Sequence, residues 1–298
     1  MRHEEFKERI LREPKGFYGD STVITVEKIW KNNSLHLEEI QIRRTDRISN
    51  AAPVIRLDSL YREYQRGMEL EECVKIISDK VENFEYPKAV EEFTKKLKDW
   101  KFAQKYVHPV LLSVKENEEL LENLVFTPIL DLAVVYILRI KCDEGVSTCI
   151  RVDYKQLEYY GIDKEELHRQ ALCNMEHDGY RFRSITEILR EMDPTSQREE
   201  AAEDEIPMYV LTNQAKSYGA AGLLDKKLLQ EFAGGRSFYI LPSSVHETIF
   251  VPAEEECDPK RLDCMVADIN QTTVSKEERL SDHSYYYDGE IGEIRMCA

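Results

Sequence analysis

Residues 237–251 read SFYILPSSVHETIFV and place a proline corner between two apolar runs. The runs 237–241 and 247–251 are rich in β-branched and aromatic residues, which is typical of strands. A proline followed by two serines favours a turn. The stretch therefore predicts two strands joined by a short polar corner at Pro242.

The same kinds of pattern continue in both directions from this stretch. Runs of β-branched and apolar residues predict further strands at 22–30, 35–42, 54–57, 110–114, 133–140, 148–152, 208–212 and, as an edge strand, 285–287. Apolar residues at helical spacing predict helices at 4–12, 60–66, 70–84, 226–232 and 259–269, and helices that begin near Pro87 and Asp163. Helices and strands mix without a regular βαβ period. This favours an α+β fold, with mixed or antiparallel sheets and packed helices, over a doubly wound sheet.

The chain is 298 residues long, which suggests about two domains. We expect a first domain over residues 1–105, made of an N-terminal hairpin and helices. A larger α+β domain is expected over residues 106–298. Within it, residues 191–206 are expected to form an exposed acidic loop, because the segment is strongly acidic and has almost nothing to bury.

Charge and composition restrict the classes of partner and compartment. With 57 acidic and 41 basic side chains the net charge is -16, which repels phosphate backbones and anionic lipids. We therefore expect neither nucleic acid nor a membrane as partner, although Arg43, Arg44 and Arg47 leave a nucleic-acid-linked regulator as an alternative. No apolar run is long enough to span a membrane and no signal peptide is recognisable, so a soluble, cytoplasmic protein is expected. The seven cysteines form no C-x-x-C pair and are expected to be reduced thiols.

The proline corner carries the one constellation that resembles a reactive site. The common motifs of nucleotide-binding folds, zincins and elbow-type serine hydrolases are absent from the sequence. In an extended segment Ser244 and His246 share a face, and a serine beside a histidine is the minimum arrangement for acyl transfer. Glu247 is a further candidate, but an acid from the same segment could not easily also orient His246, so the third member would have to come from elsewhere. The structural alternative is that the serines cap the turn and that His246 and Glu247 bind neighbouring polar groups. Both interpretations stay open at this point.

Metal and cofactor signals are weaker. Glu165 with His168, and Cys173 with His177, have spacings that place two ligands on one helix face. A metal site needs a third ligand, and the sequence identifies none, so we expect no metal and no cofactor. Asp282, His283 and Asp288 surround the tyrosine run at 285–287 and are more simply explained by a strand near the terminus.

Several segments together resemble one uncharacterised family. The segments are Tyr209–Asn213, Gly219–Ala221, Phe238–Glu247, Met265 and Val266 with Asn270, and Leu280–Asp282. They are similar to the Firmicutes family of the domain of unknown function DUF5688, which is found mostly in gut anaerobes and often near mobile genetic elements. The resemblance covers most of the chain and implies a cytoplasmic bacterial protein, without assigning a reaction. It also leads us to expect one structural unit over 208–283, with Asn213, His246 and Asn270 meeting in a binding site together with Ser243.

The leading hypothesis is a non-enzymatic binding or accessory protein that recognises a protein partner or a small ligand, and that is associated with mobile elements. The absence of enzyme motifs motivates it, and the acidic field suits a basic partner. The alternative from another class is a hydrolase or transferase that uses Ser244 and His246. The sequence does not decide whether the protein is an enzyme.

Overall fold

The computed structural model describes residues 1–12, 22–44, 54–82, 92, 95–141, 147–192, 207–242, 244–253 and 258–297. The expected acidic loop from residue 193 onward, the helix near Pro87, Arg47 and Ser243 lie outside these residues. The chain divides into two compact units. The first comprises Met1–Lys31 and Leu35–Lys95, and the second comprises Asn32–Ser34 and Lys96–Ala298.

The first unit is built on a three-stranded antiparallel sheet of order β1-β2-β3. Its strands are β1 (Thr22–Trp30), β2 (His36–Arg44) and β3 (Val54–Arg56). The turn between β1 and β2 contains Asn33 at φ 58° and Ser34 at φ 53°. Asparagine tolerates this left-handed conformation better than most residues, which explains why the sequence predicts the hairpin correctly.

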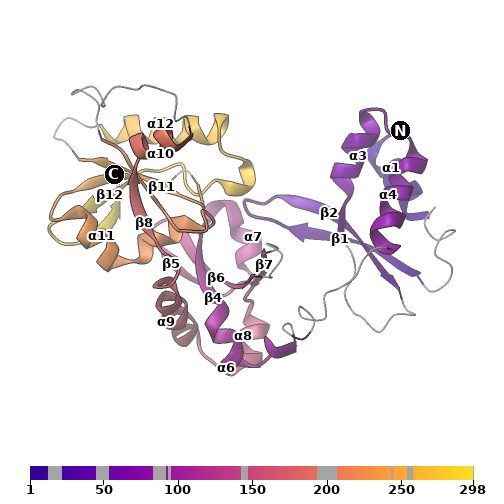
Figure 1. The fold of residues 1–298 in the computed structure, drawn as a ribbon, viewed down its shortest axis with the longest axis horizontal. Coiled ribbons are helices and arrows are strands. Elements are labelled where there is room, and N and C mark those ends of the chain that lie inside the picture. The colour runs from indigo at the N-terminus through magenta and orange to yellow at the C-terminus, as the bar shows by residue number, and fades with distance from the viewer. Residues whose placement is uncertain are drawn as a thin grey trace. The chain divides into compact units, whose positions relative to one another are not determined.

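In the described residues of the first unit, three helices lie together beside its sheet (Figure 1). They are α1 (His3–Arg12), α3 (Leu57–Gln65) and α4 (Leu70–Glu82). Their apolar stripes pack on β2 and β3, and Phe6, Ile40, Leu57 and Ile77 are among the fully buried residues of this core. The 3.6-residue period of the apolar positions therefore produces the packing that it predicts.

The second unit contains two antiparallel sheets. The smaller sheet has β6 (Leu132–Lys141) at its centre, with β4 (Val107–Ser113) on one side and β5 (Phe126–Ile129) and β7 (Ser147–Arg151) on the other. Helix α9 (Lys164–Met175) packs on β4 and β6, and Asp163 caps it by accepting a hydrogen bond from the Glu166 N–H at 2.7 Å. The short helices α6 (Trp100–Ala103), α7 (Glu118–Leu121) and α8 (Tyr154–Tyr160) complete this layer.

The larger sheet has six strands in the order β13-β12-β10-β11-β9-β8. Its strands are β8 (Arg181–Ser184), β9 (Tyr209–Thr212), β10 (Phe238–Leu241), β11 (Thr248–Pro252), β12 (Tyr285–Asp288) and β13 (Glu293–Met296). Helix α12 (Pro259–Thr272) packs on one face, where Leu262 and Val266 meet Leu241 and Val251. Helix α11 (Lys226–Ala233) contributes Phe232 to an aromatic cluster with Phe182, Tyr209, Phe238 and Phe250. Helix α10 (Ile185–Met192) follows β8.

The α+β class is confirmed, and every described strand pair is antiparallel. One detail was wrong: the tyrosine strand β12 lies between β13 and β10, so it is an interior strand. Its alternation reflects the burial of Tyr285 and Tyr287 on one face. The 3-10 helix η3 (Gly219–Leu224) contacts β9 of the larger sheet and β4 of the smaller one. Within the described part of the chain, no helix is long and apolar enough to cross a membrane.

Candidate functional site

The proline corner is tied to its surroundings through backbone groups and short polar side chains. The Oγ atom of Ser244 accepts a hydrogen bond from the backbone N–H of His246 at 3.0 Å. The Val245 N–H donates to the carbonyl of Glu278 at 2.8 Å, and the Val245 carbonyl accepts from the Ala220 N–H at 3.2 Å. These are the contacts by which serines and backbone groups stabilise a turn.

The imidazole of His246 is held by partners other than Ser244. Its Nδ1 atom accepts a hydrogen bond from the backbone N–H of Tyr218 at 3.1 Å, so the ring proton is on Nε2. Nε2 lies 3.4 Å from Oε1 of Glu278. Glu247 is exposed. A catalytic role for Ser244 and His246 stays a prediction, and it would require the imidazole to exchange these contacts for the Ser244 hydroxyl.

The predicted binding residues divide between two neighbouring loops. Asn213 is fully buried, and its side chain donates to the Ser217 carbonyl at 2.8 Å and accepts from the Ser217 N–H at 3.2 Å. It therefore shapes the loop whose next residue, Tyr218, contacts His246. Asn270 is also buried, but its amide donates to the Ser281 carbonyl at 2.9 Å, on a different loop. The structure thus places Asn213 and His246 around the 213–218 loop, whereas Asn270, on α12, binds the loop that contains Ser281.

The helix with metal-like spacings, α9, uses His168 for packing and hydrogen bonding. His168 Nδ1 is 2.8 Å from the hydroxyl of Tyr136, which in turn lies 2.7 Å from Thr127 Oγ1. Burial lowers the pKa of His168, with the nearby Lys164 adding to the effect, so the neutral imidazole is favoured. Cys173 on the same helix is exposed. His168 is therefore engaged with the sheet below the helix.

A polar layer that the sequence analysis missed lies on one face of the smaller sheet. His108 on β4 is directly opposite Ile137 on β6, and Ile137 is also opposite Arg151 on β7. Arg139 is two residues beyond Ile137, and Cys149 is opposite Arg139. Because side chains alternate along a strand, all of these residues share one face. The polar layer therefore brings two arginines, a histidine and a cysteine together.

The best-defined group in the polar layer joins His108, Arg139 and Asp178. Nδ1 of His108 lies 3.0 Å from Oδ2 of Asp178, and Nη1 of Arg139 donates to Oδ1 of Asp178 at 2.9 Å. The exposed side-chain fractions are only 13% for His108, 8% for Asp178 and 7% for Arg139. The carboxylate thus orients both the imidazole and the guanidinium, and it neutralises one positive charge in a largely desolvated place.

Two buried donors beside this group have no acceptor. Nη2 of Arg139 and the hydroxyl of Tyr180 are both buried and make no hydrogen bond of good geometry, although the Asn213 side chain lies close enough to the Tyr180 hydroxyl to lower its pKa. Burial raises the pKa of Tyr180, and the Asp178 charge adds to the rise while Arg139 opposes it, so the phenol keeps its proton. An unsatisfied buried donor costs roughly 1–3 kcal/mol, which makes two of them beside one ion pair unusual.

The residues at the start of η3 border the polar layer. Tyr218 has a φ of 55°, a left-handed conformation that is uncommon for a residue with a side chain. Gly219 follows it, and a Cβ atom there would lie 2.6 Å from Thr212 Oγ1 and would also meet the His246 carbonyl. Burial raises the pKa of Tyr218, and the charges of Cys149 and Arg151 act on it in opposite directions. The Tyr218 phenol therefore belongs to the same layer as the two arginines.

This arrangement can bind an anionic oxygen and can hold a histidine in one tautomer. Arg139 Nη2 and the Tyr180 hydroxyl are donors suited to a carboxylate or phosphate oxygen. With Nδ1 of His108 facing Asp178, its Nε2 atom is the basic nitrogen. Sequence reasoning missed the layer because its members come from segments far apart in the chain. The available signal was a charged residue, Arg139, inside the otherwise apolar stretch 132–140.

Comparison with known proteins assigns the chain to a family without a known activity. Residues 3–289 match a family model described as a family of unknown function, DUF5688. Because the match covers most of the chain, the chain belongs to this family. No curated protein and no solved structure matches it. The function therefore has to be argued from the geometry of the polar layer and the proline corner.

Proposed function

For this member of a family of unknown function, we propose a non-enzymatic binding role, with a small anionic ligand bound at the polar layer of the second unit. The observation that carries the proposal is the pair of buried donors without an acceptor, Arg139 Nη2 and the Tyr180 hydroxyl. A carboxylate or phosphate oxygen between them would satisfy both.

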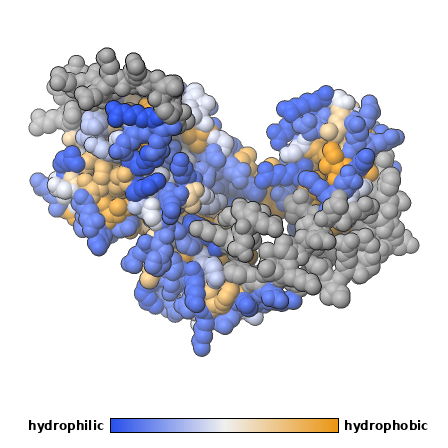
Figure 2. Space-filling model, in the orientation of Figure 1, coloured by the Kyte–Doolittle hydropathy of each residue, from blue (hydrophilic) through white to orange (hydrophobic). Residues whose placement is uncertain are grey.

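The surface of the described residues favours a small ligand over a protein partner. Figure 2 shows a face that is hydrophilic over most of its described area, with apolar side chains gathered in a few places. The most exposed large apolar side chains are Tyr159 and Tyr154 on α8, Ile291 after β12, Val23 on β1 and Met265 on α12, so only α8 carries two of them. A protein interface usually needs a continuous patch with buried aromatic anchors.

The setting of this binding role follows from the family resemblance. We place the protein in the cytoplasm of a bacterium, as an accessory factor of a mobile element that responds to a small metabolite-like acid. The net charge of -16 supports a small ligand, because the molecule as a whole repels extended polyanions.

A thermal-shift titration tests the proposal with two probes, inorganic phosphate and acetate. At a hundredfold excess over Kd, binding stabilises the folded state by about 2.7 kcal/mol, so the wild-type melting temperature rises. Arg139→Lys keeps the charge but removes Nη2, and Tyr180→Phe removes only the hydroxyl, so both are expected to reduce the rise. Arg183→Lys, which alters an ion pair with the exposed Glu191, is the matched control and keeps the full rise. The absence of any rise in the wild type would contradict the proposal.

The geometry of His108 favours a second candidate function, a hydrolase or transferase. The Asp178 carboxylate orients the imidazole of His108, as the aspartate orients the histidine base in a catalytic triad. The nucleophile would be Ser244 with His246 as its own base, or a substrate hydroxyl activated by His108. A serine-reactive fluorophosphonate probe tests whether Ser244 is the nucleophile. Labelling of the wild type that disappears in Ser244→Ala supports this role. If neither the wild type nor Ser244→Ala is labelled, Ser244 is excluded as the nucleophile.

A further inference from the structure

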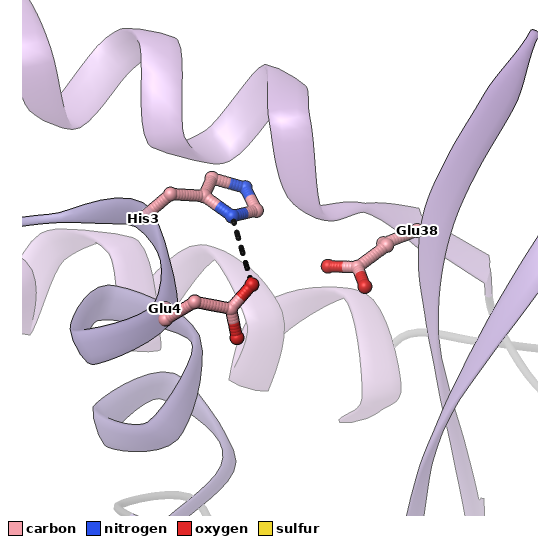
Figure 3. A group of neighbouring side chains, drawn as sticks. All are labelled: His3, Glu4 and Glu38. Atoms are coloured by element: carbon pink, nitrogen blue, oxygen red, sulfur yellow. Dashed lines mark ion pairs between the residues drawn. The ribbon is translucent and has the colours of Figure 1, made fainter.

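A second group of ligand-type side chains lies in the first unit, far in sequence from the polar layer. His3 and Glu4 from α1 and Glu38 from β2 each offer one ligand atom, and these atoms all lie within 4.8 Å of one another. Figure 3 shows the imidazole and the two carboxylates turned toward a common centre. Nδ1 of His3 is 4.0 Å from Oε1 of Glu4, so a small adjustment would let one ion contact both.

One unpartnered carboxylate oxygen distinguishes this group from an ordinary surface cluster. Oε2 of Glu38 is buried and has no hydrogen-bond donor, and Nε2 of His3 is buried without a hydrogen bond. Nε2 faces Oδ1 of Asp58 at 3.4 Å. If Nδ1 binds a metal, the ring proton is fixed on Nε2 and points at a carboxylate, which is the usual outer partner of a metal-bound histidine.

Neighbouring groups hold the ligands in place. The ring of Tyr61 contacts the His3 ring edge to face, with centroids 4.8 Å apart, and the Tyr61 hydroxyl donates to the Met1 carbonyl at 3.0 Å. Lys7 donates to Oε1 of Glu38 at 2.6 Å, so Oε2 is the oxygen of this carboxylate that has no donor. Because α1, α3 and β2 each supply part of this shell, its geometry depends on the packed core of the first unit.

The charge of the shell matches a divalent cation. Glu4, Glu38 and Asp58 carry three negative charges, and Lys7 offsets one of them, which leaves a local charge of about -2 when His3 is neutral. One imidazole nitrogen with two carboxylate oxygens suits manganese, iron or zinc better than magnesium or calcium, which prefer oxygen ligands alone. Three protein ligands leave further positions to water, and Glu4 is on the solvent side.

We propose that His3, Glu4 and Glu38 bind one divalent transition-metal ion, with Asp58 orienting His3 from the outer shell. The site is independent of the proposed anion-binding role, because all of its residues belong to the first unit. The sequence did not single out these ligands, because they come from α1 and β2, which no local spacing connects.

Binding of Mn²⁺, followed by electron paramagnetic resonance of the free ion, tests the site in the full chain without an N-terminal tag. The wild type is expected to bind one equivalent. His3→Ala and Glu38→Gln are expected to remove binding, and Asp58→Asn to weaken it by about 10- to 100-fold, as loss of an outer-shell partner does. Glu5→Gln removes one carboxylate charge at an exposed position of α1, the helix that carries His3 and Glu4, and is expected to bind like the wild type.

A gain-of-binding variant separates loss of the site from loss of the fold. Lys7→Gln removes the ammonium group that competes for Glu38, so its Mn²⁺ affinity is expected to rise by about tenfold or more. A damaged fold cannot produce that result. The proposal is overturned if the wild type binds no Mn²⁺ and no Zn²⁺, if Glu5→Gln loses as much affinity as Glu38→Gln, or if Lys7→Gln binds no more tightly than the wild type.

Discussion

At the scale of single residues, the roles of Ser244 and His246 at the proline corner can be tested by substitution. Ser244 and His246 each make hydrogen bonds that hold the corner and the entrance to η3. The residue types and their alternation could be predicted from sequence. Their partners could not, because Tyr218 and Glu278 are brought to His246 by the tertiary fold.

Ser244→Ala and His246→Ala are each expected to lower stability by about 1–2 kcal/mol, since each leaves a backbone N–H without its acceptor. For a domain of this size the melting temperature falls by about 2–8 °C, which differential scanning calorimetry measures. Glu247→Ala, at an exposed position, is the control and changes little. Unchanged or raised stability in both variants would show that these groups are retained for binding or chemistry.

Tyr136 is one of the buried phenols that make the folded state less stable at alkaline pH. Burial raises the pKa of its phenol to about 12, with Glu165 adding to the rise and the hydrogen bond to Thr127 opposing it. In the unfolded chain the phenol titrates near a pKa of about 10. Between these values the unfolded chain releases a proton that the folded chain keeps, so stability is full below pH 10 and falls as pH rises toward 12.

The expected loss from this phenol is about 1.4 kcal/mol for each pH unit in that window. Urea unfolding at pH 9, 10 and 11 measures it, and Tyr136→Phe is expected to have a shallower pH dependence than the wild type. Tyr159→Phe, at an exposed position on α8, serves as the control. Equal slopes for the wild type and Tyr136→Phe would refute the assignment of this loss to Tyr136.

At the scale of elements, the sequence predicts most of the long helices and strands but not the short ones. Asp163 at the cap of α9 and Gly234 at φ 54° after α11 mark ends that local chemistry fixes. β5 has only four residues and contains Pro128, and β8 has four residues with two arginines, so neither carries a strand pattern of its own. These strands form because a neighbouring strand supplies the pairing.

The element that organises the candidate site is η3, and Gly219 is its tightest point. Gly219→Ala places a methyl group against Thr212 Oγ1 and the His246 carbonyl, so we expect a loss of about 1–3 kcal/mol of stability. Chemical denaturation measures the change. Gly161→Ala, which has a positive φ but no atom within 4 Å of the new Cβ, isolates backbone strain. A smaller effect at Gly219 than at Gly161 would contradict the close packing of η3.

At the scale of the whole molecule, composition and charge restrict the classes of partner that we expect. The tertiary fold is what brings the residues of the polar layer together. The sequence predicts a domain boundary near residue 105. In the structure the boundary between the two compact units lies between residues 95 and 96 of the chain, and Asn32–Ser34 are grouped with the second unit. Such a discontinuous unit has no local signature. The polar layer likewise combines His108, Arg139 and Asp178 from three separate segments, so only the tertiary structure reveals it.

Native mass spectrometry of the purified full chain tests the central claim most directly. The wild type is expected to retain a small anionic ligand whose mass identifies it, and Arg139→Lys and Tyr180→Phe are expected to release it while remaining folded. A wild-type mass equal to that of the bare chain, together with no stabilisation by phosphate or acetate, would contradict the account.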